Sequence, residues 1–143
     1  MPPVSCFFIG HADAPSGIFP ELTACIEHLI TQHHVTEFFF GWHGSFDRLV
    51  LRALQESKAR HPQIRRVLVL AYHPSQLSTA LPTSVDESVY PFDGAVPPRF
   101  AISKANQKMI QQCDYLIAYV RHTGKDRDFL EYAQRKQKRI FLI

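Results

Sequence analysis

The sequence predicts an α/β protein with a three-layer Rossmann-like fold, in which helices cover both faces of a mainly parallel sheet of five strands. One observation behind this prediction is that short apolar runs alternate with segments of helical periodicity along the whole chain. Another is that most of these runs are apolar at consecutive positions, which is typical of strands covered on both faces. We therefore expect a single Rossmann-like domain over residues 1–143.

The predicted strands are runs dominated by aromatic and β-branched residues. They are Val4–Ile9, Thr36–Phe40, Val67–Ala71, Tyr115–Val120 and Ile140–Ile143. Strict alternation with helices implies parallel strands joined by right-handed crossovers. Numbered along the chain, these five strands are expected in the sheet order 3-2-1-4-5, which places a crevice between the first and the fourth.

Four amphipathic segments separate the strands, and each carries an apolar stripe. They run from Phe19 to His33, from Phe46 to about Arg60, from Arg99 to Gln112 and from about Arg127 to Gln137. Pro20 is compatible with the first turn of the first helix, and His61-Pro62 ends the second. All of them are predicted to pack an apolar face against the sheet.

One connection between a predicted strand and the next predicted helix is unusually long. The segment at about 72–97 contains about 26 residues rich in Pro, Ser and Thr, whereas such loops usually have about 2–6. It is a lid, a binding loop or the crossing from one sheet edge back to the centre, and the sequence leaves these three open. Its aromatic residues Tyr90 and Phe92 could also build a homodimer contact.

Composition limits the environment and the partners. The formal charge is +3, and the cationic excess lies in the last helix, where it complements the helix dipole, so we do not expect a nucleic acid partner. The three cysteines are widely spaced in apolar segments, which indicates core residues of a reducing, cytoplasmic protein. No run approaches the roughly 18 residues that span a bilayer, and the histidines lack zinc-site spacing. We therefore expect no membrane, no metal and no cofactor.

Polar loops follow four of the predicted strands. In open α/β sheets, ligands bind outside the carboxyl ends of the strands, at the switch point of the strand order. The loops concerned carry Gly10-His11, Gly41 to Asp47, Tyr72 and Arg121 to Asp126. They are the candidate ligand-binding segments.

The turn Gly41-Trp42-His43-Gly44-Ser45-Phe46-Asp47 joins the second strand to the second helix. Its glycines let a ligand approach the backbone, and a helix starting at Ser45 or Phe46 would aim free N–H groups at a phosphate or carboxylate. Alternatively, Gly44 and Ser45 merely turn the chain and cap the helix. Asp47 likewise either accepts hydrogen bonds from a ribose or base, or stabilises the helix dipole.

Other candidates carry the same ambiguity. His11 faces the crevice or is a solvated turn residue, and Asn106 points to the site or to solvent. Arg99, directly after two prolines, could bind a phosphate in a bidentate manner. Thr123-Gly124 could form a second anion-binding turn, followed by Asp126 and Asp128 as catalytic carboxylates or as ordinary helix-start residues. The sequence contains no nucleophile elbow, Walker loop or dinucleotide glycine motif.

Several landmarks occur in a characteristic order. They are Phe7-Phe8-Ile9-Gly10-His11, Phe40-Gly41-x-x-Gly44-Ser45-Phe46-Asp47-Arg48, Leu70-Ala71-Tyr72, Tyr90-Pro91, Pro97-Pro98-Arg99-Phe100-Ala101-Ile102-Ser103-Lys104-x-Asn106-x-x-Met109-Ile110 and Cys113-Asp114-Tyr115-Leu116-Ile117-Ala118-Tyr119-Val120. Over essentially the whole chain, this set resembles the YpsA-like branch of the SLOG superfamily, a branch of uncharacterised proteins. That superfamily also includes the DprA DNA-processing proteins and the LOG-type phosphoribohydrolases.

The resemblance implies a Rossmann-like domain that binds nucleotides or nucleotide-derived ligands. The residues it implies for the site are Gly10, His11, Gly44, Ser45, Phe46, Asp47, Arg99, Asn106, Thr123 and Gly124. Relatives typically show an aromatic residue and Gly-Gly-Ala after a His-Ser/Thr pair, whereas this chain has His122-Thr123-Gly124-Lys125-Asp126-Arg127. The glutamate of the phosphoribohydrolases therefore has no clear counterpart, and Asp128 and Glu131 are the nearest candidates.

These observations favour the binding or sensing of a nucleotide or nucleotide-derived small molecule. One alternative is an N-glycosidic hydrolase acting on nucleoside monophosphates, with Asp47, Asp128 or Glu131 as its catalytic carboxylate. A second alternative is a DNA-associated interaction protein. Whether the chain catalyses a reaction stays open at this point.

Overall fold

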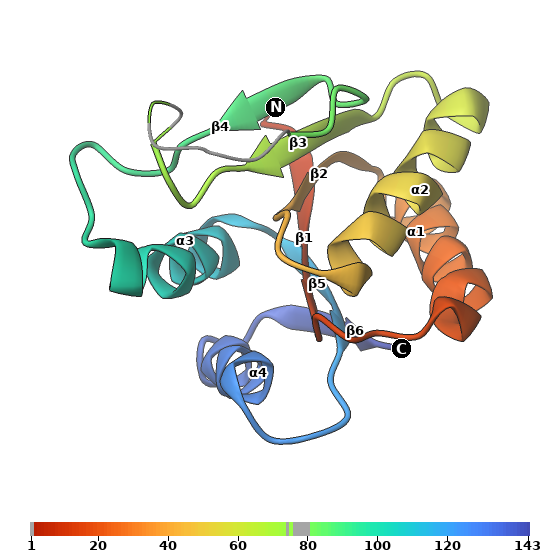
Figure 1. The fold of residues 1–143 in the computed structure, drawn as a ribbon. Helices are drawn as coiled ribbons and strands as arrows, with labels where there is room; N and C mark the ends of the chain where they lie inside the picture. The colour runs from red at the N-terminus through yellow and green to blue at the C-terminus, as the bar shows by residue number, and fades with distance from the viewer. Residues whose placement is uncertain (1, 74, 76–80) are drawn as a thin grey trace.

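In the part of the chain that the structure describes, six parallel strands form one sheet in the order β4-β3-β2-β1-β5-β6 (Figure 1). The computed structural model describes residues 2–73, 75 and 81–143. The strands are β1 (Val4–Gly10), β2 (Val35–Phe40), β3 (Arg65–Val69), β4 (Glu87–Val89), β5 (Tyr115–Tyr119) and β6 (Arg139–Leu142). The strand order reverses at β1, so the switch point lies between β1 and β5.

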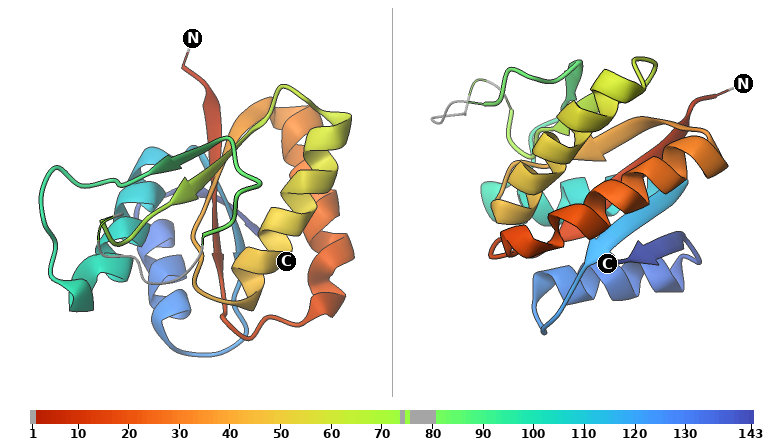
Figure 2. Two further views of the ribbon diagram at one scale, coloured as in Figure 1. Left: turned by 45° about the horizontal axis from the view of Figure 1, so that its top comes forward. Right: turned by 90° about the vertical axis from the view of Figure 1, so that its right-hand side faces the viewer.

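Helices cover both faces of this sheet, as the two further views show (Figure 2). Helices α1 (Phe19–His33) and α2 (Ser45–Arg60) pack on one face. A short 3₁₀ helix, η1 (Ser16–Ile18), directly precedes α1 in the sequence. Helices α3 (Pro98–Gln112) and α4 (Lys125–Arg135) pack on the other. The predicted three-layer Rossmann-like fold is confirmed.

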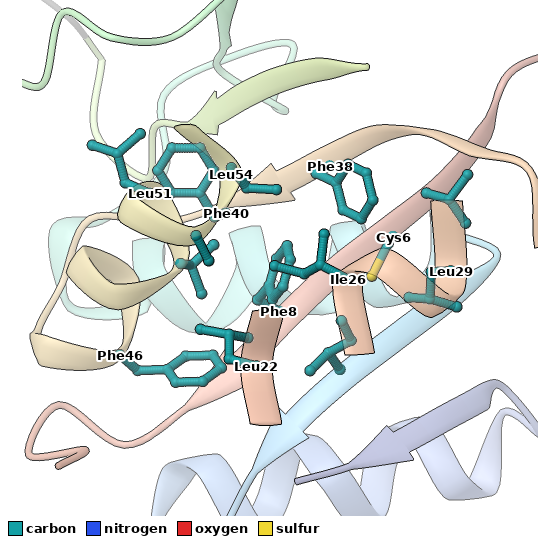
Figure 3. Close-up of a cluster of buried hydrophobic side chains, with 14 of the residues drawn as sticks. Cys6, Phe8, Leu22, Ile26, Leu29, Phe38, Phe40, Phe46, Leu51 and Leu54 are labelled. Atoms are coloured by element: carbon teal, nitrogen blue, oxygen red, sulfur yellow. The ribbon is translucent and has the colours of Figure 1, made fainter. Parts of the chain in front are cut away.

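The central strand β1 supplies side chains to both layers. Cys6 and Phe8 point toward α1 and α2, where they join a cluster with Leu22 and Ile26 (Figure 3). Their neighbours Phe7 and Ile9 belong to the cluster under α3 and α4. Successive side chains of a strand alternate between faces, so an uninterrupted apolar run is what a strand between two helical layers requires.

The sheet differs from the prediction by one strand. Strand β4 lies at the sheet edge, inside the segment that was expected to be a loop. Its three residues, Glu87–Val89, contain one apolar side chain and therefore carry no periodic pattern. The strand is held instead by its partner, because the N–H of Leu70 donates to the carbonyl of Val89 and Arg65 pairs with Glu87. Pro74 and residues 76–80 of the predicted loop lie outside the described residues.

The cysteines are free thiols built into the core or against it. Cys6 is fully buried, and burial raises the pKa of Cys25 to about 11 and that of Cys113 to about 12. Thiols with raised pKa values are poor nucleophiles and poor metal ligands at neutral pH. Among the described residues, no helix combines the length and the apolar character needed to cross a bilayer.

Candidate functional site

A cavity of about 170 Å³ lies at the carboxyl end of β1. Its walls come from the last residues of β1 with the loop that follows, from the start of α2, from the start of α4 and from one side of α3. Since β1 and β5 are the strands where the order reverses, the cavity occupies the switch point of the sheet. Ligands of open α/β sheets bind at this position.

Close packing of two glycines brings the β1 loop and α2 together. A Cβ at Gly10 would collide with the ring of Phe46, and a Cβ at Gly44 would lie 2.5 Å from the Cα of Ala12. The N–H of Ser45 donates to the carbonyl of Ala12 across this contact, at 2.8 Å. Glycine is therefore needed at both positions for the approach of backbone to backbone and backbone to ring.

The start of α2 presents backbone donors at the cavity. Gly44 is the N-cap residue, Ser45 is the first helical residue, and no side chain caps the helix. The N–H of Ser45 is used by Ala12, whereas the amides of Phe46 and Asp47 have no intrahelical partner. The positive end of the helix dipole lies at the same place.

Asp47 is a half-buried carboxylate on the cavity wall. Burial raises its pKa to about 6, and the negative charge of Asp126 acts in the same direction. The N–H of His43, which donates to Oδ2 of Asp47 at 2.7 Å, and the charge of Arg48 oppose the shift. A carboxyl group that titrates near neutrality can exchange a proton under physiological conditions.

His11 is buried and is held from both ring nitrogens. Its Nε2 accepts a hydrogen bond from the N–H of Arg121 at 2.8 Å, so this nitrogen carries no proton. The proton is therefore on Nδ1, which donates to Oδ2 of Asp126 at 3.1 Å. The ring also stacks on His122, with centroids 3.7 Å apart. With both nitrogens engaged, His11 ties the β5–α4 loop to β1 and has no free atom for proton transfer.

The start of α4 forms the wall opposite α2. Its N-cap residue, Gly124, has a φ of +139°, a conformation that side-chain-bearing residues rarely adopt. Lys125 and Asp126 follow it and line the cavity. Burial raises the pKa of Asp126 above its usual value, although its contacts with His11 and His122 oppose this.

An apolar surface and one amide complete the cavity. Phe129 of α4 and Ile102 of α3 supply apolar area, and Asn106 stands one helical turn from Ile102. Such a combination of apolar walls with a few polar groups is typical of small-molecule sites. Within the described ranges, no group of three His, Cys, Asp or Glu side chains is placed to hold a metal ion.

The structure gathers some of the predicted site residues and separates others. Gly10, His11, Gly41, Gly44, Phe46, Asp47 and Asn106 line the cavity. Ser45 supports it through its bond to Ala12. The residues that do not line it are Tyr72, Arg99, Thr123, Gly124, Asp128 and Glu131.

The separated residues have other environments. Tyr72 packs against the apolar cluster under α3 and α4, and the exposed Arg99 lies 4.7 Å from the ring of its neighbour Phe100. Asp128 and Glu131 are exposed, so the carboxylate at the cavity on α4 is Asp126. Helix α4 begins at Lys125, two residues before the predicted start, so Asp126 belongs to its first turn.

Some cavity residues carry little or no sequence signal for a ligand. His43, Lys125 and Asp126 lie within the candidate loop segments, but their sequence pattern does not single out His43 or Lys125 as contacts. Ile102 and Phe129 carry an ordinary core pattern, which says nothing of a ligand. Ile102 and Asn106 on α3 are four residues apart on one helix face, and so are Lys125 and Phe129 on α4, a spacing that could have indicated a shared wall.

Comparisons with known proteins address the fold alone. No family model matches the chain, and no curated protein matches it. Among solved structures, the chain is similar to that of a Moco carrier protein from Chlamydomonas reinhardtii, with a TM-score of 0.60 and 15% sequence identity. The match covers 99% of this chain and 76% of the other. At this identity the likeness establishes the Rossmann-like architecture.

Proposed function

We propose that the cavity between the starts of α2 and α4 binds a nucleotide or a nucleotide-derived small molecule. The observation that carries this proposal is the convergence of two helix N-termini on one cavity at the switch point of the sheet. Each N-terminus offers backbone N–H donors and a positive dipole end, which together favour a phosphate. Lys125 adds a full positive charge at the same wall.

The remaining lining suits the uncharged parts of such a ligand. Phe46, Ile102 and Phe129 provide apolar area against which a base can pack. The carboxylates of Asp47 and Asp126 accept hydrogen bonds, as the hydroxyls of a ribose or the N–H groups of a base require. A ligand with both an anionic end and a donor-rich end therefore matches the charge pattern.

Two likenesses support a small-molecule function. The similar solved structure is that of a Moco carrier protein. The ordered motifs from Phe7 to Val120 resemble the SLOG superfamily, and we propose that the chain is a single domain of this kind from the cytoplasm. Neither likeness identifies the ligand, so it has to be determined by binding.

A thermal-shift screen over mononucleotides, dinucleotides, cyclic nucleotides and ADP-ribose tests the proposal. A ligand at about 100 times its dissociation constant should stabilise the protein by roughly 2.7 kcal/mol, which corresponds to a rise in Tm on the order of 10 °C. Absence of a shift with every nucleotide would rule the proposal out.

A charge-matched pair of variants links any binding to the cavity. Lys125→Gln removes the cation on the cavity wall and should lower the affinity for an anionic ligand by about fivefold to tenfold. Lys136→Gln removes an exposed cation just past the end of α4, away from the cavity, and should change affinity less than about twofold. Equal effects of the two variants would place the ligand elsewhere.

The raised pKa of Asp47 favours a second candidate function, an N-glycosidic hydrolase acting on nucleoside monophosphates. A carboxyl group titrating near 6 can protonate a departing base, and the neighbouring Asp126 can stabilise positive charge on the ribosyl group. Base release from a nucleotide panel should then be lost on Asp47→Asn and kept on Asp128→Asn, because Asp128 lies outside the cavity. Turnover that survives Asp47→Asn would eliminate this mechanism.

A further inference from the structure

A groove with several polar side chains continues from the switch-point cavity toward the C-terminal end of α4. It has a volume of about 230 Å³, lies between α3 and α4, and shares Lys125 and Phe129 with the cavity. The cavity alone, at about 170 Å³, is smaller than the roughly 300 Å³ from which small-molecule pockets usually start. Cavity and groove together reach that range.

The groove is lined by groups that bind sugars and phosphates. Ser103 and Gln107 of α3 face Tyr132 and Arg135 of α4, so hydroxyl, amide and guanidinium groups are all present. The side-chain amide of Gln111 donates to the hydroxyl of Tyr132 at 2.6 Å, a bond that joins the two helices beside the groove. Arg135 lies 5.9 Å from the centre of the Tyr132 ring.

Three charged side chains lie along the groove. Lys125 at one end and Arg135 at the other are positive, and Asp128 between them is negative. None of the three forms an ion pair with another residue that the structure describes. From Lys125 to Arg135, α4 rises by about 15 Å, which is more than a mononucleotide needs beyond its phosphate.

We propose that this groove, called here the α3–α4 groove, is a second subsite that holds the distal half of an elongated ligand. The chemical class is a nucleoside diphosphate joined to a sugar or to a second nucleoside. Its nucleoside occupies the switch-point cavity, its diphosphate lies at Lys125, and its distal hydroxyl or phosphate groups meet Gln107, Asp128 and Arg135. This inference rests on the proposed nucleotide-binding function and extends it to ligand size.

The second subsite is tested by measuring the dissociation constants of matched pairs of ligands with isothermal titration calorimetry. The probes are AMP with ADP-ribose, GMP with GDP-mannose, UMP with UDP-glucose, and NAD as a dinucleotide. For the base that the cavity accepts, the conjugate should bind about tenfold tighter than the mononucleotide. The double variant Gln107→Ala with Arg135→Gln should remove most of this gain and change mononucleotide affinity less than about twofold.

Lys108→Gln is the matched control, because it removes an exposed cation from α3 without lining the groove. It should leave the preference for the conjugate unchanged. Mononucleotides that bind as tightly as their conjugates would overturn the second subsite and leave the nucleotide site standing. Failure of every probe to bind would overturn both proposals. If the double variant lowered the affinities of the mononucleotide and of its conjugate by the same factor, the groove would not contact the distal half of the ligand, and the second subsite would be overturned.

Discussion

Two polar residues at the switch point, the buried His11 and the half-buried Asp47, have different roles. His11 has both ring nitrogens engaged, by Arg121 and Asp126, and therefore positions the loop before α4. Asp47 keeps one oxygen, Oδ1, without a hydrogen-bond partner among the described residues, and so it can meet a ligand. Holding a carboxylate in a half-buried cavity costs folding free energy, which proteins accept at functional sites.

Asp47→Asn is therefore expected to stabilise the protein at neutral and alkaline pH. The folded-state pKa of about 6 lies above the ordinary 3.8, so the native state binds a proton that the unfolded state releases between these values. Stability consequently falls as pH rises from about 4 to 6, and the variant escapes this loss. The gain should be on the order of 1–2 kcal/mol at pH 8, after allowance for solvent screening, and should vanish below about pH 4.

Urea unfolding at pH 4 and pH 8 measures this difference. Asp128→Asn, on the exposed side of α4, is the matched control and should alter stability little at either pH. An Asp47→Asn protein that is less stable than wild type at pH 8 would mean that the carboxylate makes a favourable contact which outweighs its burial.

At the scale of elements, the site depends on where two helices begin. Helix α2 begins against the β1 loop because Gly44 lets the backbone of Ala12 approach, and α4 begins at a glycine with positive φ. Both starts consequently point at one cavity. The same local feature, a glycine before a helix, thus has a different physical cause on each side.

Gly44→Ala should destabilise the protein by about 1–3 kcal/mol and weaken binding at the cavity. The added Cβ would lie 2.5 Å from a backbone atom of Ala12, so relief requires a shift of the α2 start rather than a side-chain rotation. Gly17→Ala is the control, since a Cβ there meets nothing within 4 Å and should change stability by less than about 0.5 kcal/mol. Similar midpoints in urea for both variants would contradict the close packing.

At the scale of the whole molecule, β1 couples the two helical layers. Phe8 packs under α1 and α2, while Phe7 and Ile9 pack under α3 and α4. Because side chains of β1 belong to both apolar clusters, unfolding of one helical layer together with β1 would also disrupt the packing of the other layer. We therefore expect the described layers to unfold together.

Truncations on opposite faces test this coupling. Ile26→Ala in α1 and Met109→Ala in α3 remove fully buried side chains and should each cost about 2–5 kcal/mol. Trp42, the sole tryptophan, packs against the α1–α2 cluster, so its fluorescence reports on that layer. Fluorescence and far-UV circular dichroism should give one coincident urea transition in both variants. A Met109→Ala protein whose Trp42 transition stays at the wild-type midpoint would show independent layers.

The sequence by itself determined the α/β class, the order of the five longer strands and the loops that meet at the switch point. These follow from apolar runs, helical periodicity and the handedness of crossovers, all of which act locally or by general rule. The turn from Gly41 to Asp47 could be found in this way. The short edge strand β4 could not, because its pairing with β3 supplies the order that its own residues lack.

Only the tertiary structure decided which polar side chains share the cavity. Successive residues of a helix are about 100° apart, so Asp126 and Asp128 point in nearly opposite directions. Asp126, in the first turn of α4, lines the cavity, whereas Asp128 lines the space between α3 and α4. The chemistry of this cavity depends on helix phase and on the close approach of Gly44 to Ala12, and both are set by contacts between residues distant in the sequence.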